Sequence, residues 1–246
     1  MAVLTGGHNH FGFTLGIITL ETQFPRVVGD IGNALTFPFP VLYRPVKGAS
    51  VSRVVIERDK TLLEPFIEAG RTLLREGVKA IMTTCGFLAM FQREMSEALP
   101  VPVYTSSLIQ IPLVYVATGQ RRVGVLTVNS ETLTGLHFES VGASGIPLAI
   151  EGIQHTHFGD VLINNRFELD LAQAEQDVVE AARRLVTKNP DIGAIVLECT
   201  NFPPFARSIQ DAVGLPIFDV ITLTYMAYAT AERKAVLSST INILNM

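Results

Sequence analysis

The chain has 246 residues, of which 48% are hydrophobic and 17% charged, with a formal net charge of -4. This length allows one large or two small domains with a sizeable core. The chain has no basic stripe that would indicate nucleic acid as a partner. Its two cysteines are too few for a disulfide framework. The longest apolar stretch, residues 109–119, is shorter than the ~18 residues of a membrane span, and no signal peptide is recognised. We expect a cytoplasmic protein that binds neither membranes nor nucleic acid.

Apolar runs typical of buried strands alternate with helical spacings along the chain. The expected strands are 13–20, 39–46, 78–82, 100–104, 123–128, 147–150, 191–197 and 215–218. The expected helices are 60–75, 88–99, 106–118, 131–140, 171–187, 203–213 and 222–237. Prolines around 39–46 keep that strand from the centre of a sheet. Residues 21–30 and 155–168 are expected to be loops beside a crevice. This alternation predicts an α/β fold with parallel sheets.

The two cysteines stand at matching points of a repeated unit. Cys85 and Cys199 each follow an apolar strand and precede a helix, and a Leu-Pro pair starts 14 and 16 positions later. A repeat of this kind suggests two similar lobes related by a pseudo-twofold axis. Since ligands bind at the carboxyl ends of parallel strands, we expect the two thiols to face one another across one small-molecule site.

The second cysteine motif also carries a family resemblance. Residues 197–203, Leu-Glu-Cys-Thr-Asn-Phe-Pro, resemble the Leu-Gly-Cys-Thr-His-aromatic-Pro signature of the aspartate/glutamate racemase superfamily. That superfamily also contains hydantoin racemases, maleate isomerases and arylmalonate decarboxylases. Thr83-Thr84-Cys85-Gly86 matches the position of the first family cysteine, and residues 24–33 look like a sub-group of uncharacterised racemase-like proteins.

The resemblance implies two Rossmann-like lobes, no cofactor and a substrate carboxylate held between the lobes. The first lobe would comprise 1–118 plus 222–246 with Cys85, and the second 119–221 with Cys199. Two departures argue against glutamate as the substrate. Asn201 stands where amino-acid racemases commonly have His or Glu, and an Asp-Ser pair of glutamate racemases is missing near Thr19.

The residues in these motifs suit removal of a proton next to a carboxylate. Without an electron sink, such a reaction needs hydrogen-bond donors aimed at the developing negative charge. A helix start lowers a neighbouring thiol's pKa, so one cysteine could act as base and the other as acid. Predicted substrate-binding residues, taken from the motifs and the loop after the first strand, are Thr84, Gly86, Asn129, Thr200, Asn201, Thr19, Glu21 and Arg26. Arg26 would bind a carboxylate or carbonyl group of the substrate, and Glu21 would bind an ammonium group.

These observations give a main hypothesis and two alternatives. The main one is a cofactor-independent racemase or epimerase in which Cys85 and Cys199 exchange a proton on an amino acid or hydantoin-like compound. The first alternative is an isomerase or lyase of the same superfamily that uses one nucleophilic or basic cysteine. The second is a small-ligand binding protein without catalysis, with the cysteines as inert core residues. We expect a homo-oligomer from the resemblance and the apolar composition.

The sequence gives no support for a metal or nucleotide. The two His-x-His pairs, His8/His10 and His155/His157, lack the third and fourth ligands that zinc requires. Neither a P-loop nor a dinucleotide-binding glycine motif is present.

Overall fold

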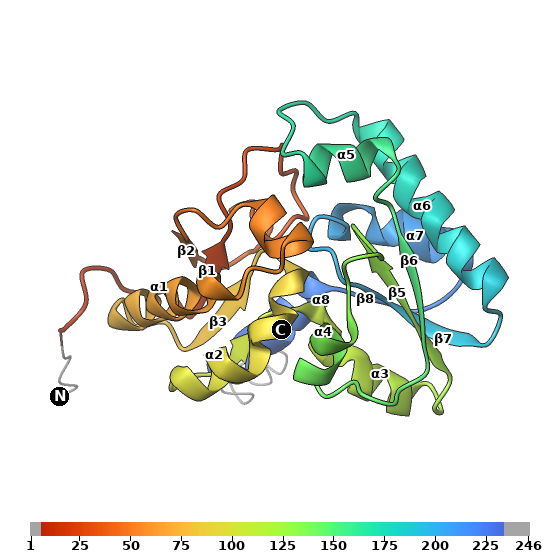
Figure 1. Ribbon diagram of the computed structural model, residues 1–246. Helices are drawn as coiled ribbons and strands as arrows, with labels where there is room; N and C mark the ends of the chain where they lie inside the picture. The colour runs from red at the N-terminus through yellow and green to blue at the C-terminus, as the bar shows by residue number, and fades with distance from the viewer. Residues whose placement is uncertain (1–5, 234–246) are drawn as a thin grey trace, which may run out of the picture.

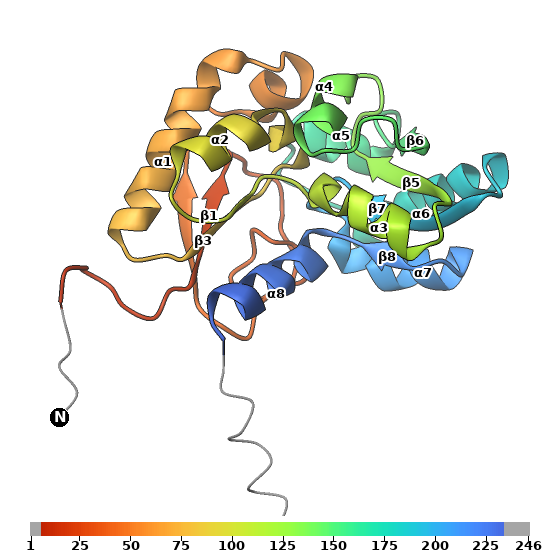
Figure 2. The ribbon, with the colours of Figure 1, turned by 90° about the horizontal axis from the view of Figure 1, so that it is seen from below.

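Two four-stranded parallel sheets form the two halves of the molecule in the computed structural model, which describes residues 6–233. The first sheet has the order β2-β1-β3-β4. Its strands are β1 (Leu15–Thr19), β2 (Val41–Pro45), β3 (Ala80–Thr83) and β4 (Val103–Tyr104). Helices α1 (Leu63–Arg75) and α2 (Gln92–Ala98) cover one face, and α8 (Val220–Ala231) covers the other (Figure 2). With helices on both faces, β1 and β3 are almost wholly buried, which explains their continuous apolar sequences.

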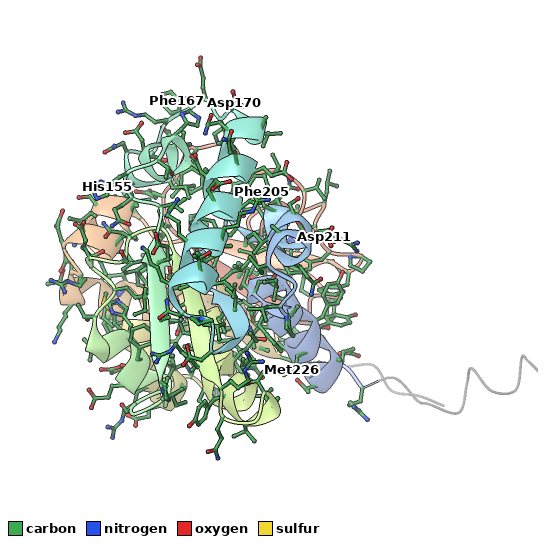
Figure 3. The ribbon with its side chains drawn as sticks, turned by 90° about the vertical axis from the view of Figure 1, so that its right-hand side faces the viewer. His155, Phe167, Asp170, Phe205, Asp211 and Met226 are labelled. Carbon is green, nitrogen blue, oxygen red and sulfur yellow. The ribbon has the colours of Figure 1, made fainter. Side chains whose placement is uncertain are left out.

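The second sheet repeats this order as β6-β5-β7-β8. Its strands are β5 (Arg122–Thr127), β6 (Leu148–Gly152), β7 (Ile192–Leu197) and β8 (Ile217–Phe218). Helices α6 (Leu171–Lys188) and α7 (Ala206–Val213) lie side by side on the outer face of this lobe (Figure 3). Helix α3 (Ile111–Ala117) packs against β5 and β7. The predicted α/β class with two similar parallel-sheet lobes is therefore confirmed (Figure 1).

Short helices bring the chain from the strand ends into the space between the lobes. The 3-10 helix η3 (Gly86–Phe91) follows β3 and continues into α2, while η4 (Ser107–Gln110) precedes α3 and η5 (Pro203–Phe205) precedes α7. Helix α4 (Gly135–Ser140) of the second lobe packs against η3 of the first. Two further short helices, at 52–56 and 60–62, precede α1. These contacts join the two lobes around the end of β3.

Most predicted elements are present, with shorter ends. The edge position predicted for 39–46 is confirmed, because β2 pairs on one side only. The loop predicted for 155–168 is wrong: α5 (His157–Ile163) forms there. The Thr156 hydroxyl caps it by accepting the Gly159 N–H, and Phe158, Val161 and Leu162 bury one face.

Near the C-terminus, the last helix differs from its predicted boundaries. The last helix begins at Val220 and ends at Ala231, earlier than the predicted Leu237, and residues 234–246 lie outside the described part of the chain. Along residues 6–233 no helix is both long and apolar enough to cross a membrane.

Candidate active site

Cys85 and Cys199 line the same small cavity between the two lobes. Cys85 follows β3 and Cys199 follows β7, which occupy equivalent positions in the two sheets. The cavity has a volume of about 30 Å³, enough for one or two water molecules. The prediction that the sequence repeat brings the two cysteine loops together is thus confirmed in geometry.

Direct hydrogen bonds hold the two strand ends against each other. The Thr200 hydroxyl donates to the Thr84 carbonyl at 2.7 Å, and the Ser107 hydroxyl donates to the Leu197 carbonyl at 2.6 Å. A Cβ added at Gly86 would lie 2.2 Å from the Glu198 carbonyl oxygen, so only glycine allows this approach. The lobes are therefore in fixed register at the site.

Cys85 is a half-buried residue at the start of η3. Burial and the nearby Glu198 carboxylate raise its pKa to about 12, although the Phe87 and Leu88 N–H groups and Arg26 oppose the rise. The helix start does lower the thiol pKa, as expected, but the net shift of the Cys85 pKa is upward. Desolvation outweighs the backbone donors.

Cys199 is more deeply buried and has a different neighbourhood. Burial raises its pKa well above the usual value, and the Glu198 charge adds to this. Its Sγ donates to the Asn201 Oδ1 at 3.5 Å, while the Asn201 Nδ2 donates to the Asp30 carboxylate at 2.6 Å. Because a carboxylate oxygen can only accept from that amide, Asp30 fixes the orientation of Asn201 and directs its oxygen to the thiol.

Asp30 also anchors the cation of the site. The Arg26 guanidinium donates to Asp30 Oδ1 at 2.7 Å and to the Thr22 hydroxyl at 3.0 Å, and it lies over the Phe24 ring. Asp30 and Arg26 are both largely buried. A network from Arg26 through Asp30 and Asn201 thus reaches Cys199, joining the loop after β1 to the second cysteine motif.

Glu198 is the second buried carboxyl of the site. It precedes Cys199, is fully buried, and accepts the Thr127 hydroxyl on Oε2 at 2.7 Å. Its Oε1 has no hydrogen-bond partner within the described chain. Burial raises the Glu198 pKa to about 8, against the opposing Thr127 hydrogen bond.

The predicted site residues divide into three groups. Those that line the cavity with the cysteines are Thr84, Gly86, Thr200, Asn201 and Arg26. Thr19 and Glu21 instead line an open groove outside the cavity, with Arg26 between the two spaces. Asn129 lines neither, because its side-chain oxygen accepts the N–H groups of the following turn, at Glu131 and Thr132.

Four polar residues in or next to the site were missed in the sequence: Glu198, Thr22, Asp30 and Thr127. Glu198 could have been noticed, since the family signature has glycine at that position. Asp30 and Thr127 carried no signal of their own, because their partners are distant in the chain. The helix α5 region does reach the site, as Leu162 lines the cavity and the Asn165 oxygen accepts the Gln23 N–H at 2.7 Å.

The paired histidines do not contribute to this site. His155 is exposed and contacts Glu131, and neither residue lines the cavity. Between residues 6 and 233 there is no group of three or more His, Cys, Asp or Glu that could hold a metal ion.

Comparison with known proteins gives the family. The model for the Asp/Glu/hydantoin racemase family matches residues 41–227, which include both cysteines. The chain belongs to this family. Unliganded arylmalonate decarboxylase has the same fold, with a TM-score of 0.60 and 17% identity over 91% of this chain and 94% of that one.

Curated relatives of this family member include lyases. A dimethylsulfoniopropionate lyase from Durusdinium sp. clade D is 29% identical over 218 residues, covering 85% of this chain and 71% of the relative. Dimethylsulfoniopropionate lyase 7 from Emiliania huxleyi is 30% identical over 220 residues, covering 85% of this chain. The chain spans 64% of that second relative's length.

Proposed function

We propose that this family member is a lyase that cleaves a carbon–sulfur bond by β-elimination from a small sulfonium carboxylate of the dimethylsulfoniopropionate type. The observation that carries the proposal is a cavity lined by two thiols, in a chain that matches lyases of this kind over 85% of its length. The same cavity contains Arg26, a cation suited to a substrate carboxylate. This is the lyase alternative that the sequence left open.

The reaction needs a base beside the carbon next to the carboxylate. We assign this to Cys85, because backbone N–H groups and Arg26 favour its thiolate, whereas Cys199 donates its proton to Asn201. The Cys85 thiolate takes the proton, the carbon–hydrogen electrons form the new double bond, and the carbon–sulfur bond breaks. Acrylate and dimethyl sulfide leave, and the proton remains on Cys85.

A bound sulfonium substrate would also lower the raised pKa of the Cys85 thiol. Burial is the largest factor that opposes the Cys85 thiolate in this site. A bound cation within a few ångströms favours the charged form of an acid. The positive charge of the substrate would therefore favour the Cys85 thiolate. Arg26 lines both the cavity and the open groove, and we propose the groove as the route by which the substrate reaches the thiols.

Measurement of dimethyl sulfide in the headspace tests the proposal directly. The wild-type protein should release dimethyl sulfide and acrylate in equal amounts from dimethylsulfoniopropionate. Cys85→Ser should reduce kcat by ~10²–10⁴-fold, the usual contribution of a general base. Cys199→Ser reports on the second thiol, and we expect a smaller loss from it.

The racemase hypothesis gives a different result in a parallel assay. The protein would then incorporate solvent deuterium at the α-carbon of an amino acid or hydantoin, with loss of optical rotation. Deuterium incorporation without any dimethyl sulfide from sulfonium substrates would overturn the lyase proposal in favour of the racemase.

A further inference from the structure

Glu198 lines the cavity together with the two cysteines, and one of its side-chain oxygens has no hydrogen-bond partner within the described chain. Its Oε2 accepts the Thr127 hydroxyl, whereas Oε1 has no partner within the described chain although the side chain is fully buried. Oε1 lies against the other cysteine loop, since a Cβ added at Gly86 would be 2.3 Å from it. Cys85, Gly86, Glu198 and Cys199 all line the cavity. An unpaired polar atom at this place points to a ligand.

The groups around Glu198 give it no counter-ion. The cation lining the cavity is Arg26, and its guanidinium is already bound to Asp30. The remaining titratable neighbours are the two thiols, and His137 behind the Phe87 ring is neutral, because burial lowers its pKa to about 4. No salt bridge of residues 6–233 includes Glu198. A buried carboxyl without a cation takes up a proton.

Protonation turns Oε1 from an unpaired acceptor into a donor beside Gly86, a residue that lines the cavity. This matters because two of the donor groups predicted from the sequence are not free to donate into the cavity. The Thr200 hydroxyl donates to the Thr84 carbonyl, and Asn129 does not line the cavity, since its side-chain oxygen accepts the N–H groups of the following turn. Removal of a proton next to a carboxylate places negative charge on the carboxylate oxygens, which needs a donor nearby.

We propose that Glu198 is a catalytic residue that acts as a neutral carboxylic acid, donating a hydrogen bond from Oε1 to a carboxylate oxygen of the substrate. The bond strengthens as negative charge develops on that oxygen, and the proton stays on Glu198. A neutral carboxylic acid in an apolar site performs this task in other enzymes. The inference rests on the proposed function for the reaction, and it adds where the substrate carboxylate lies.

Two substitutions distinguish the need for a hydrogen-bond donor from the need for a carboxyl group. In Glu198→Gln, the amide oxygen can accept the Thr127 hydroxyl, so the amide NH₂ takes the place of the Oε1 hydroxyl without any ionisation. Glu198→Ala removes the donor. We expect Gln to keep kcat within ~10-fold of wild type at pH 7, and Ala to lose ~10²–10³-fold, as for an oxyanion donor.

The pH profile distinguishes a donor from a structural residue. Wild-type kcat should decline above about pH 8, where Glu198 ionises and repels both the substrate carboxylate and the thiolate. Glu198→Gln should lack this decline. A Gln variant as inactive as Ala, or one that keeps the alkaline decline, would overturn the proposal.

A chemical probe tests the same contact without any turnover. Iodoacetate and iodoacetamide both alkylate Cys85 through loss of iodide, but only iodoacetate carries a carboxylate. The rate ratio of iodoacetate to iodoacetamide, followed by mass spectrometry, should be lower in Glu198→Ala than in wild type at pH 7. Above pH 8 the wild-type ratio should fall and the Gln ratio should not.

The two assays keep the proposals apart. A ratio that responds to Glu198 in a protein that releases no dimethyl sulfide would support the carboxylate contact and reject the lyase. A ratio identical in wild type, Gln and Ala would reject the contact, even if dimethyl sulfide is released.

Discussion

Glu198→Gln should change how the stability of this protein depends on pH. The pKa of this buried carboxyl is raised from 4.5 to about 8, so the folded protein keeps its proton over a range in which the unfolded chain loses it. The unfolded state then binds fewer protons, and stability falls as pH rises. The loss begins near pH 4.5 and is complete just above pH 8. Gln at this position has no such dependence.

The two pKa values give the size of the effect. Each pH unit between them costs the wild type ~1.4 kcal/mol in free energy of unfolding. Integrated from pH 5 to pH 9, the stability of Glu198→Gln relative to wild type should rise by about 4 kcal/mol. For a chain of this length that is a change of roughly 8–16 °C in the difference between the two melting temperatures.

Reversible urea unfolding followed by far-UV circular dichroism measures this, since the chain has no tryptophan for fluorescence. The difference between variant and wild type, taken at pH 5, 7 and 9, removes contributions from all other groups. Glu139→Gln, at an exposed position on α4, controls for the general effect of losing one carboxylate. A difference for Glu198→Gln that is constant from pH 5 to pH 9 would refute the neutral carboxyl.

Two further substitutions test the contacts around the site. Gly86→Ala would place a Cβ 2.2 Å from the Glu198 carbonyl oxygen, so we expect loss of at least 1–3 kcal/mol of stability and most activity. Gly135→Ala, where nothing lies within 4 Å, is the matched control, and equal melting temperatures of the two variants would contradict the close approach. Asp30→Asn should cost ~3 kcal/mol in urea unfolding by leaving Arg26 with a buried unpaired charge, and an unchanged midpoint would exclude that ion pair as a stabilising contact.

The sequence alone was informative about the scaffold because strand and helix patterns are local. The buried runs before Cys85 and Cys199 form strands β3 and β7. Each of these strands is third in the spatial order of its sheet. The same reasoning failed at α5, where two turns of helix are too short for a clear periodic signal. The cap at Thr156 and three buried side chains are sufficient there once the second lobe provides a surface.

The meeting of the two thiols could be predicted from the chain, since a repeated strand–cysteine–helix unit places both at strand carboxyl ends. The protonation and hydrogen bonding of the thiols, in contrast, depend on how the two lobes pack around them. Burial raised the thiol pKa that the helix start was expected to lower, and distant partners bound the hydroxyl of Thr200 and the amide of Asn201. Glu198 is buried from solvent, and no neighbouring cation compensates for the loss of hydration. Desolvation and hydrogen-bond partnership depend on neighbours far apart in the chain, so no local pattern records them.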